Sequence, residues 1–346
     1  MPEDSTRYSE RLGALSRAQL QAALDRFALG KLLEVHAPAG GLFGQNLFLT
    51  AESGEWVFRG APHWYRGAPH PTWQLAKERW FAERIHRETA APAAWPYLVE
   101  TSSDLFGWAW ALMPRLPGEC AQFARHTLSP DERLAFARSM GETLAELHSL
   151  QASAPGDYDP DLDAIQPDTS LRSYALRVLD GCRERALAPP STLEAADLAM
   201  IERVVRETQD ALDVPVVPSC IHLDYHWGNL NVARRDGTWQ VSGIFDLMTC
   251  EFGDPEMDLA RPVAVLATDD RPLLPAFLDG YLARRPLRPG ARERFRLFML
   301  IDRLIIWSFG RRTQKWFGPD ARFRDFARLF LDLDSQLEVK SPSRPA

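Results

Sequence analysis

Two neighbouring stretches of the sequence decide its fold class: IHLDYHWGNLNV at residues 221–232 and SGIFDLMTCEFGDPEMDLA at residues 242–260. In the first, Asp224 and Asn229 are five residues apart, which is the spacing of the catalytic-loop pattern H-x-D-x-x-x-x-N. In the second, Asp246 ends an apolar run, where a second ligand for a metal ion would lie. Phosphoryl transfer depends mainly on positioning and charge neutralisation. A carboxylate that orients a hydroxyl, together with oxygen ligands for Mg²⁺, supplies both, so the pattern indicates phosphoryl transfer.

A structural interpretation of the same residues competes with this one. In it, His222 and Asp224 form a buried hydrogen-bonded pair and Asn229 caps a turn. An H-x-D pair alone favours that interpretation. Here the asparagine lies at the required spacing, an aspartate ends the following strand, and G-D-P-x-x-D-L-A follows at residues 253–260. Together these features favour phosphoryl transfer.

The two stretches resemble the aminoglycoside phosphotransferase and choline kinase superfamily, in which the loop reads HGDLHPGN and the later strand leads into G-D-P-x-x-D-L-A. The likeness extends over about residues 30–265. It implies an α+β, protein-kinase-like two-lobed fold: an N-lobe of antiparallel sheet with one main helix, and a larger, mainly helical C-lobe. The expected boundaries are residues 1–115 for the N-lobe and 116–346 for the C-lobe, with a hinge at 111–116 in the run GWAWALMPRLPG.

The resemblance also implies roles for the motif residues. Asp224 is expected to be the catalytic base, and His222 to orient the catalytic loop. Asn229 and Asp246 are expected to hold Mg²⁺ against the triphosphate of ATP or GTP. One departure is Leu223, where the family usually has glycine; we expect it to alter the packing of the loop rather than the chemistry.

Three further motif positions receive structural interpretations. His226 lies where the family often has its second histidine. Asp254 and Asp258 are expected to brace the catalytic loop and the helix that follows, rather than to touch substrate.

A glycine-rich turn, APAGGLFGQN at residues 37–46, lies between two strand-like runs. Its backbone amides would suit phosphate groups, although such a hairpin is commonly just a turn. In the resembled family a similar turn lies over the nucleotide. We therefore expect Gly40, Gly41 and Asn46 to cover the nucleotide.

A kinase also needs a cation on the third strand, paired with a helix glutamate. The chain has only four lysines, and none lies between Lys31 and Lys77. Arg59, which ends the strand-like run WVFR, stands at the matching position. Its expected partner is Glu78, unless Glu78 pairs with a neighbour on a solvated helix face. Met113 in the hinge is expected near the edge of the purine, or else is plain core.

Hydrophobic periodicity and capping patterns predict the main elements. The predicted helices span residues 17–29, 73–88, 129–150, 171–186 and 192–212, and the predicted N-lobe strands span residues 32–35, 46–50 and 56–59.

Composition narrows the range of partners. The formal net charge is −7, and residues 101–250, which hold the motifs, contain 22 acidic and 12 basic residues. No basic footprint for nucleic acid is present there, and the most apolar late stretch, FMLIDRLIIW, is interrupted by Asp302 and Arg303. The N-terminus is polar, and the four cysteines form no C-x-x-C pair and no metal-ligand spacing. Both features predict a cytoplasmic protein. We expect a monomer or homodimer that acts on a small-molecule hydroxyl acceptor, with no nucleic acid or membrane partner.

The acceptor itself is the least determined feature. The segment GDYDPDLDAIQPD contains Asp157, Asp159, Asp161 and Asp163, and a carboxylate cluster beside a cleft would favour an amine-bearing acceptor such as an aminoglycoside or an amino alcohol. The competing interpretation, a solvated acidic loop, carries slightly more weight.

Three alternatives in function remain open at this stage. They are a catalytically weak or inactive kinase-like module that binds nucleotide, an enzyme that transfers a nucleotidyl group to protein, and a macrolide, amino-alcohol or sugar kinase of the same fold.

Overall fold

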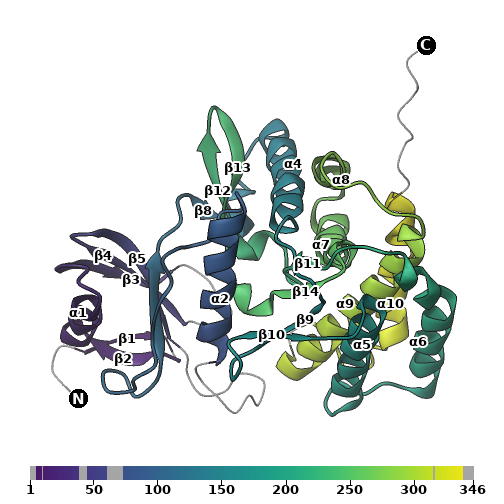
Figure 1. The fold of residues 1–346 in the computed structure, drawn as a ribbon, viewed down its shortest axis with the longest axis horizontal. Helices are drawn as coiled ribbons and strands as arrows, with labels where there is room; N and C mark the ends of the chain where they lie inside the picture. The colour runs from purple at the N-terminus through teal and green to yellow at the C-terminus, as the bar shows by residue number, and fades with distance from the viewer. Residues whose placement is uncertain (1–4, 10, 39–44, 61–72, 315, 338–346) are drawn as a thin grey trace.

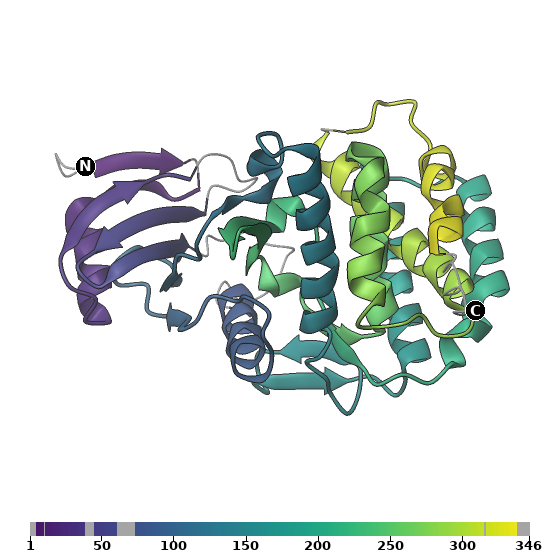
Figure 2. The same cartoon turned by 90° about the horizontal axis from the view of Figure 1, so that it is seen from above.

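The computed structural model describes residues 5–9, 11–38, 45–60, 73–314 and 316–337, and these residues form two lobes (Figure 1). Seen from above, the strands of the N-lobe lie on one side and the helices of the C-lobe on the other (Figure 2). The α+β, protein-kinase-like fold class expected from the sequence is confirmed.

The N-lobe is built on a five-stranded antiparallel sheet with the strand order β3-β4-β5-β7-β6. Its strands are β3 (Leu32–His36), β4 (Asn46–Ala51), β5 (Gly54–Gly60), β6 (Leu98–Glu100) and β7 (Trp110–Pro114). A hairpin of β1 (Ser5–Ser9) and β2 (Gly13–Ser16) and the helix α1 (Arg17–Arg26) precede the sheet. Side chains on one face of the sheet and on α1 share one apolar cluster.

The strand β7 belongs to two cores at once. Successive side chains of a strand point to opposite faces. Trp110 and Leu112 therefore join the N-lobe cluster, whereas Ala111 and Met113 join the larger cluster that fills the C-lobe. After β7 the chain passes to the C-lobe strand β8 (Glu119–Cys120). The expected lobe boundary at residue 115 falls in this connection and, as a domain boundary, stays a prediction.

The helix α2 (Trp73–Glu88) lies between the N-lobe sheet and the C-lobe (Figure 1). Leu75, Phe81 and Ile85 are fully buried and belong to the C-lobe cluster. This packing fixes the helix against the C-lobe, although one of its side chains, Glu78, reaches a residue of the N-lobe sheet.

The C-lobe is mainly helical. Its α-helices are α3 (Ala121–Ala124), α4 (Pro130–Leu147), α5 (Leu171–Leu187), α6 (Ala195–Thr208), α7 (Ala260–Asp269), α8 (Leu274–Leu282), α9 (Ala291–Thr313) and α10 (Phe323–Leu331). Its short 3₁₀ helices are η1 (Gln209–Asp213), η2 (Trp227–Asn229), η3 (Leu247–Thr249), η4 (Pro255–Leu259), η5 (Arg271–Leu273) and η6 (Asp332–Leu337). The helices α4 and α8 pack closely because Gly141 and Gly280 lie at their contact: a Cβ on Gly141 would lie 2.0 Å from the Phe277 carbonyl oxygen.

Two small sheets complete the C-lobe. One has the order β13-β12-β8, with β12 (Leu230–Arg235) and β13 (Thr238–Ile244) forming a hairpin. The other has the order β10-β9-β14-β11, from β9 (Gly156–Asp159), β10 (Ala164–Pro167), β11 (Ser219–Ile221) and β14 (Glu251–Gly253).

Local sequence signals account for much of this arrangement. The capping boxes Ser16–Gln19 and Ser129–Glu132 are both formed, at the starts of α1 and α4. The helix α1 ends at Arg26, before the predicted residue 29, because Ala28 adopts a left-handed conformation with φ 55°. The acidic segment after α4 is a β-hairpin, β9–β10, rather than a loop. Within the described ranges, no helix is long and apolar enough to cross a membrane.

Candidate active site

The β12–β13 hairpin brings two of the motif residues to the same end. Asn229 immediately precedes β12, and Asp246 is the second residue after β13; the register pairs Leu230 with Ile244. The Phe245 N–H then donates to the Asn229 carbonyl oxygen at 2.9 Å. A pair of strands in antiparallel register therefore places Asn229 and Asp246 side by side, although 17 residues separate them in sequence.

Asp224 is tied to Asn229 by two hydrogen bonds. The Asn229 amide Nδ2 donates to the Asp224 backbone carbonyl at 2.9 Å and to its carboxylate Oδ2 at 3.0 Å. The other carboxylate oxygen accepts from Arg261 Nη1 and lies 3.5 Å from His226 Nε2. Burial raises the pKa of Asp224, but Arg261 and His226 outweigh burial, so the pKa lies well below its ordinary value. The carboxylate is therefore ionised at neutral pH.

His222 is fully buried and holds the Asp224 loop to the backbone that follows β13. Its Nε2 lies 2.7 Å from the Phe245 carbonyl oxygen, to which it must donate, and its Nδ1 accepts from the Asp224 N–H at 3.3 Å. These partners require the neutral tautomer with the proton on Nε2. The position suits the predicted orienting role, which stays a prediction.

Asp258 stabilises the backbone of the loop that carries Asp224. Its carboxylate accepts the N–H groups of His222 at 2.5 Å and Leu223 at 2.6 Å. His148 Nε2 lies 3.1 Å from the same carboxylate, and both side chains are fully buried. This arrangement agrees with the bracing expected for Asp258.

Asp246 adopts a left-handed backbone conformation with φ 61° and ψ 41°. Most residues with a Cβ avoid that region, but aspartate and asparagine adopt it more readily than others. The Asp246 carboxylate is 25 % exposed, and its Oδ1 lies 3.1 Å from Arg59 Nη2 of the N-lobe. Asp246 therefore joins the two lobes across the candidate site.

Arg59 bridges two carboxylates. It lies on β5, opposite Asn46 on β4 and Ala111 on β7. Its Nη2 donates to Glu78 at 2.6 Å as well as to Asp246. Its Nη1 lies 3.5 Å from Asn46 Oδ1, and its buried Nε has no hydrogen-bond partner among the residues that the structure describes.

Glu78 is almost fully buried and receives a second donor, the Tyr97 hydroxyl. Burial raises the pKa of Glu78 above its ordinary value, although Arg59 opposes the shift. For Arg59, burial lowers the pKa of the guanidinium, but Glu78, Tyr97 and Asp246 together raise it. Arg59 is therefore a fixed cation, held by the partner that the sequence predicted.

Three further residues are predicted to bind nucleotide: Met113, Gly40 and Gly41. Met113 pairs with Val57, two residues along β7 from the partner of Arg59, and is buried; its contact with a purine stays a prediction. Gly40 and Gly41 lie outside the described residues. The structure thus brings Asn46, Arg59 and Glu78 together with Asp246.

The predicted acceptor-binding aspartates lie on the β9–β10 hairpin, and three of them have partners. Asp157 Oδ1 lies 2.5 Å from Nζ of the buried Lys77. Asp159 accepts the Asp161 N–H at 2.8 Å, and Asp163 accepts the Tyr158 hydroxyl at 2.8 Å. Within the described part of the chain, no hydrogen bond or ion pair joins this hairpin to Asp224. The acceptor-binding role of these residues stays a prediction.

Sequence reasoning missed Arg261 and Asp302. The Arg261 Nε donates to Asp302 Oδ1 at 2.6 Å, so Arg261 bridges Asp302 and Asp224. The neighbouring Arg303 Nε donates to Asp302 Oδ2 at 3.0 Å. A signal was present: two charged residues interrupt the apolar helix FMLIDRLIIW, and a charged pair inside a buried helix needs a partner.

The donor groups present fit a magnesium ion. Among described residues no cluster of three His, Cys, Asp or Glu side chains could hold a metal. Mg²⁺ does not require one, because it commonly binds one or two protein oxygen ligands together with substrate phosphates and water. Asp246 supplies a part-exposed carboxylate, and Asn229, whose Nδ2 is occupied by Asp224, turns its amide oxygen away from that contact.

The sequence matches a known protein family. A model of the phosphotransferase enzyme family matches residues 34–298. No curated protein matches the sequence.

Solved structures of aminoglycoside phosphotransferases share the fold. A thermostable mutant of aminoglycoside phosphotransferase APH(4)-Ia, in ternary complex with ADP and hygromycin B, superposes with a TM-score of 0.60 at 16% identity, covering 92% of this chain and 98% of that one. The GDP and kanamycin complex of APH(2")-IIIa gives a TM-score of 0.58 at 16% identity, with coverages of 91% and 97%. A putative aminoglycoside phosphotransferase from Ralstonia eutropha JMP134 gives 0.60 at 16% identity, with coverages of 92% and 97%.

Proposed function

This chain belongs to the phosphotransferase enzyme family, and on that premise we propose that it transfers the γ-phosphoryl group of ATP or GTP to a hydroxyl group of a small molecule. The observation that carries the proposal is a continuous set of contacts across the site. Asn229 holds the Asp224 carboxylate at 3.0 Å, the β12–β13 hairpin places Asp246 beside Asn229, and Arg59 reaches Asp246 at 3.1 Å. These contacts join a carboxylate, an amide and a guanidinium, the kinds of group that phosphoryl transfer uses.

Asp224 would orient the acceptor hydroxyl. Its low pKa makes it a weak base, so it is better suited to accept a hydrogen bond from the hydroxyl than to remove the proton early. The proton would pass to the carboxylate late in the reaction, as the hydroxyl oxygen forms its bond to phosphorus. Asn229 keeps the carboxylate in place through Nδ2.

Arg59 would draw negative charge from the phosphates. Arginine offers a planar fork of donors, and in this chain Nε of Arg59 has no partner among described residues. Asn229 and Asp246 would hold Mg²⁺, which, when bound, supplies charge neutralisation at the β- and γ-phosphate oxygens. Glu78 keeps Arg59 aimed at the site.

Mass spectrometry of the reaction products tests the proposal. The purified protein is incubated with Mg²⁺ and ATP, or GTP, and a panel of hydroxylated compounds. We expect an acceptor with one added phosphoryl group and release of the nucleoside diphosphate. A nucleotidyl adduct on protein, or bound nucleotide without turnover for the whole panel, would overturn the proposal.

An inactive nucleotide-binding module is the alternative from another class. Such a module is expected to lack the carboxylate base or a metal ligand. Asp224, Asn229 and Asp246 are all present, and the hydrogen bond of Asn229 to Asp224 and the β12–β13 register bring them together. Arg59, which stands where a kinase usually has lysine, retains a cation at that position. These observations support the catalytic proposal over the alternative.

A further inference from the structure

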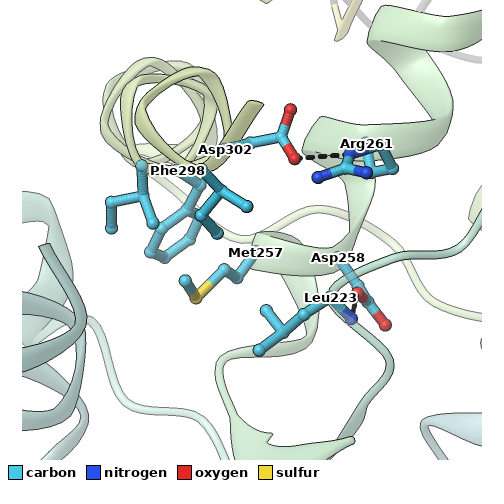
Figure 3. Close-up of a pocket in the computed structure, with 8 residues that line it drawn as sticks. Leu223, Met257, Asp258, Arg261, Phe298 and Asp302 are labelled. Carbon is cyan, nitrogen blue, oxygen red and sulfur yellow. Dashed lines mark hydrogen bonds and ion pairs between the residues drawn. The ribbon is translucent and has the colours of Figure 1, made fainter. Parts of the chain in front are cut away.

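The segment that runs from η4 into α7 holds the Asp224 loop at two points. Asp258 accepts the N–H group of Leu223 at 2.6 Å, so it fixes the backbone of the loop (Figure 3). Arg261, three residues later, donates to the Asp224 carboxylate and holds the side chain. Residues three apart on a helical segment share a face. One face of this segment therefore contacts both the backbone of the loop and the candidate base.

Arg261 is in turn held by the long helix α9. Its Nε donates to Asp302 Oδ1 at 2.6 Å (Figure 3), and Arg303 Nε donates to the other oxygen of Asp302 at 3.0 Å. The Arg303 guanidinium lies over the ring of Phe330 on α10, 4.2 Å from its centroid. Arg261, Asp302 and Arg303 are all buried. Buried groups on α7 and α9 therefore help to set the place of the Asp224 carboxylate.

This chain of charges reaches the surface at one end. The side chain of Asp224 is 27 % exposed, whereas that of Arg261 is 8 % exposed. Buried ion pairs often stabilise a protein no better than apolar residues of the same volume, because the charges lose their hydration. The chain ends on the candidate base, where an acceptor can approach. Its position therefore favours a role in the site over a role in packing.

The two oxygens of the Asp224 carboxylate have different partners. Oδ1 accepts from Arg261 Nη1 and lies 3.5 Å from His226 Nε2. His226 Nδ1 accepts the Gly228 N–H at 2.9 Å, so Nε2 carries the proton of the ring and faces Oδ1 as a donor. Oδ2 accepts one hydrogen bond from the residues that the structure describes, that of Asn229. Because a carboxylate oxygen can accept about two hydrogen bonds, Oδ2 can accept another.

From these contacts we infer that Arg261 is a positioning residue: it holds Oδ1 of Asp224 so that Oδ2, beside Asn229, accepts the hydrogen bond of the acceptor hydroxyl. The inference rests on the proposed function, in which Arg59 serves the nucleotide side of the site and Asp224 the acceptor side.

The orientation of the carboxylate matters for the transfer step. The hydroxyl oxygen forms a bond to the γ-phosphorus, and the hydroxyl proton passes to Oδ2 of Asp224. The bond from that phosphorus to the β–γ bridging oxygen breaks, and the nucleoside diphosphate leaves with its electron pair. Without Arg261 the carboxylate can turn away from the hydroxyl, and a misplacement of about 1 Å can cost about 10²-fold in rate.

Hydrolysis of ATP tests the inference without an identified acceptor, because water can take the place of the hydroxyl. Phosphate release in the presence of ATP and Mg²⁺ is measured for the unmodified protein and for Arg261→Lys. The same comparison is made with any compound of the hydroxylated panel that the protein phosphorylates. Lysine retains the charge but lacks the planar fork that contacts two carboxylates. We expect kcat to fall by about tenfold or more, with KM for ATP within about twofold.

Arg324→Lys is the matched control. Arg324 of α10 also contacts one buried and one exposed carboxylate, Asp197 at 3.3 Å and Glu194 at 2.7 Å, both near the start of α6. The same exchange at this position should leave kcat within about twofold. The Tm of each variant is measured, and the kinetics are run at a temperature at which all the proteins are folded.

Asp302→Asn is the second variant and carries the test if Arg261→Lys does not fold. It leaves the contact of Arg261 with Asp224 in place but removes the charge that holds Arg261 Nε. We expect a smaller fall in kcat, of about threefold, again with little change in KM for ATP.

An unchanged kcat in folded Arg261→Lys would overturn the inference, and so would equal falls in Arg261→Lys and Arg324→Lys. If Arg261→Lys does not fold, an unchanged kcat in Asp302→Asn has the same meaning. Phosphorylation of a panel compound at the same kcat by the unmodified protein and Arg261→Lys would leave the proposed function standing while the inference fell. Phosphate release to water alone, reduced in Arg261→Lys, would support the inference while the proposed transfer to a small molecule fell. No turnover in either assay would remove both.

Discussion

On each side of the candidate site one arginine bridges two carboxylates, but the two clusters differ in charge. Among the residues that the structure describes, Arg59 is the one guanidinium that contacts both Glu78 and Asp246. Arg261 lies between Asp224 and Asp302, and Arg303 adds a second guanidinium there. The first cluster has one cation for two carboxylates, and the second has two for two.

The pKa values of the buried carboxylates shift in opposite directions in the two clusters. Burial raises the pKa of Glu78 despite Arg59. For Asp302, burial also raises the pKa, but Arg261 and Arg303 outweigh burial and lower it. Among the described residues, Glu78 and Asp246 therefore share one guanidinium, a deficit of positive charge that a divalent cation would correct, whereas Asp224 and Asp302 together contact two. The predictions that follow test this contrast.

The largest effect is expected at the base. Asp224→Asn retains the shape of the side chain but removes the charge that, in the proposed function, orients the hydroxyl and receives its proton. We expect kcat to fall by roughly 10²–10⁴-fold, with nucleotide affinity nearly unchanged. Steady-state kinetics and nucleotide titration measure the two quantities. Normal turnover by the variant would show that Asp224 does not take part in the reaction.

Site residues that belong to a local sequence motif could be predicted from the sequence, whereas residues that only the fold brings together could not. Asp224, Asn229 and Asp246 belong to local patterns, and the partnership of Arg59 with Glu78 follows from the kinase arrangement. The ion pair of Arg261 with Asp302 joins residues 41 apart on two helices, and no local pattern sets such a distance. The β9–β10 hairpin could not be predicted because it too depends on contacts that are distant in the sequence. Its aspartates and prolines suggested a loop, but Tyr158 is buried and Lys77 on a distant helix neutralises Asp157.

The next effect concerns stability on the acceptor side. Arg261→Met leaves Asp224 without its guanidinium, while Asp302 retains Arg303. We expect a loss of about 3 kcal/mol in the free energy of unfolding, near the low end for breaking a buried pair. Arg138→Met is the matched control, because its pair with Asp279 is exposed; it should change stability by less than about 0.5 kcal/mol. Equal losses in urea melts would contradict the assigned burial of the Arg261 pairs.

On the nucleotide side, Arg59 is expected to affect activity as well as stability, because its pair with Glu78 is also buried. Arg59→Ala would remove the charge-assisted contact to phosphate that we propose, and we expect kcat/KM for ATP to fall by about 10–100-fold. Arg59→Lys should recover part of this loss because it restores the charge without the planar fork. Kinetics at varied ATP concentration measure both variants. Full activity of the alanine variant would mean that another cation neutralises the phosphates.

The smallest effect concerns Glu251, outside both arginine clusters. Burial and then Asp157 raise the pKa of Glu251 to about 7, although Lys77 opposes the shift. Between its ordinary pKa and about 7, the folded state binds more protons than the unfolded state, so stability falls as pH rises through that window. Glu251→Gln cannot titrate and should lose less Tm than the unmodified protein between about pH 5 and pH 8. Calorimetric melts across that range check this; identical pH slopes would show that Glu251 titrates normally.

Calorimetric titration of ATP, with Mg²⁺ and with a chelator in its place, tests most directly the claim that the nucleotide side carries a charge deficit for a divalent cation. The titration compares the unmodified protein, Asp246→Ala and Asp224→Asn. We predict that Mg²⁺ tightens ATP binding to the unmodified protein and to Asp224→Asn, and that this gain is lost in Asp246→Ala. An equal gain from Mg²⁺ in all three proteins would contradict the account.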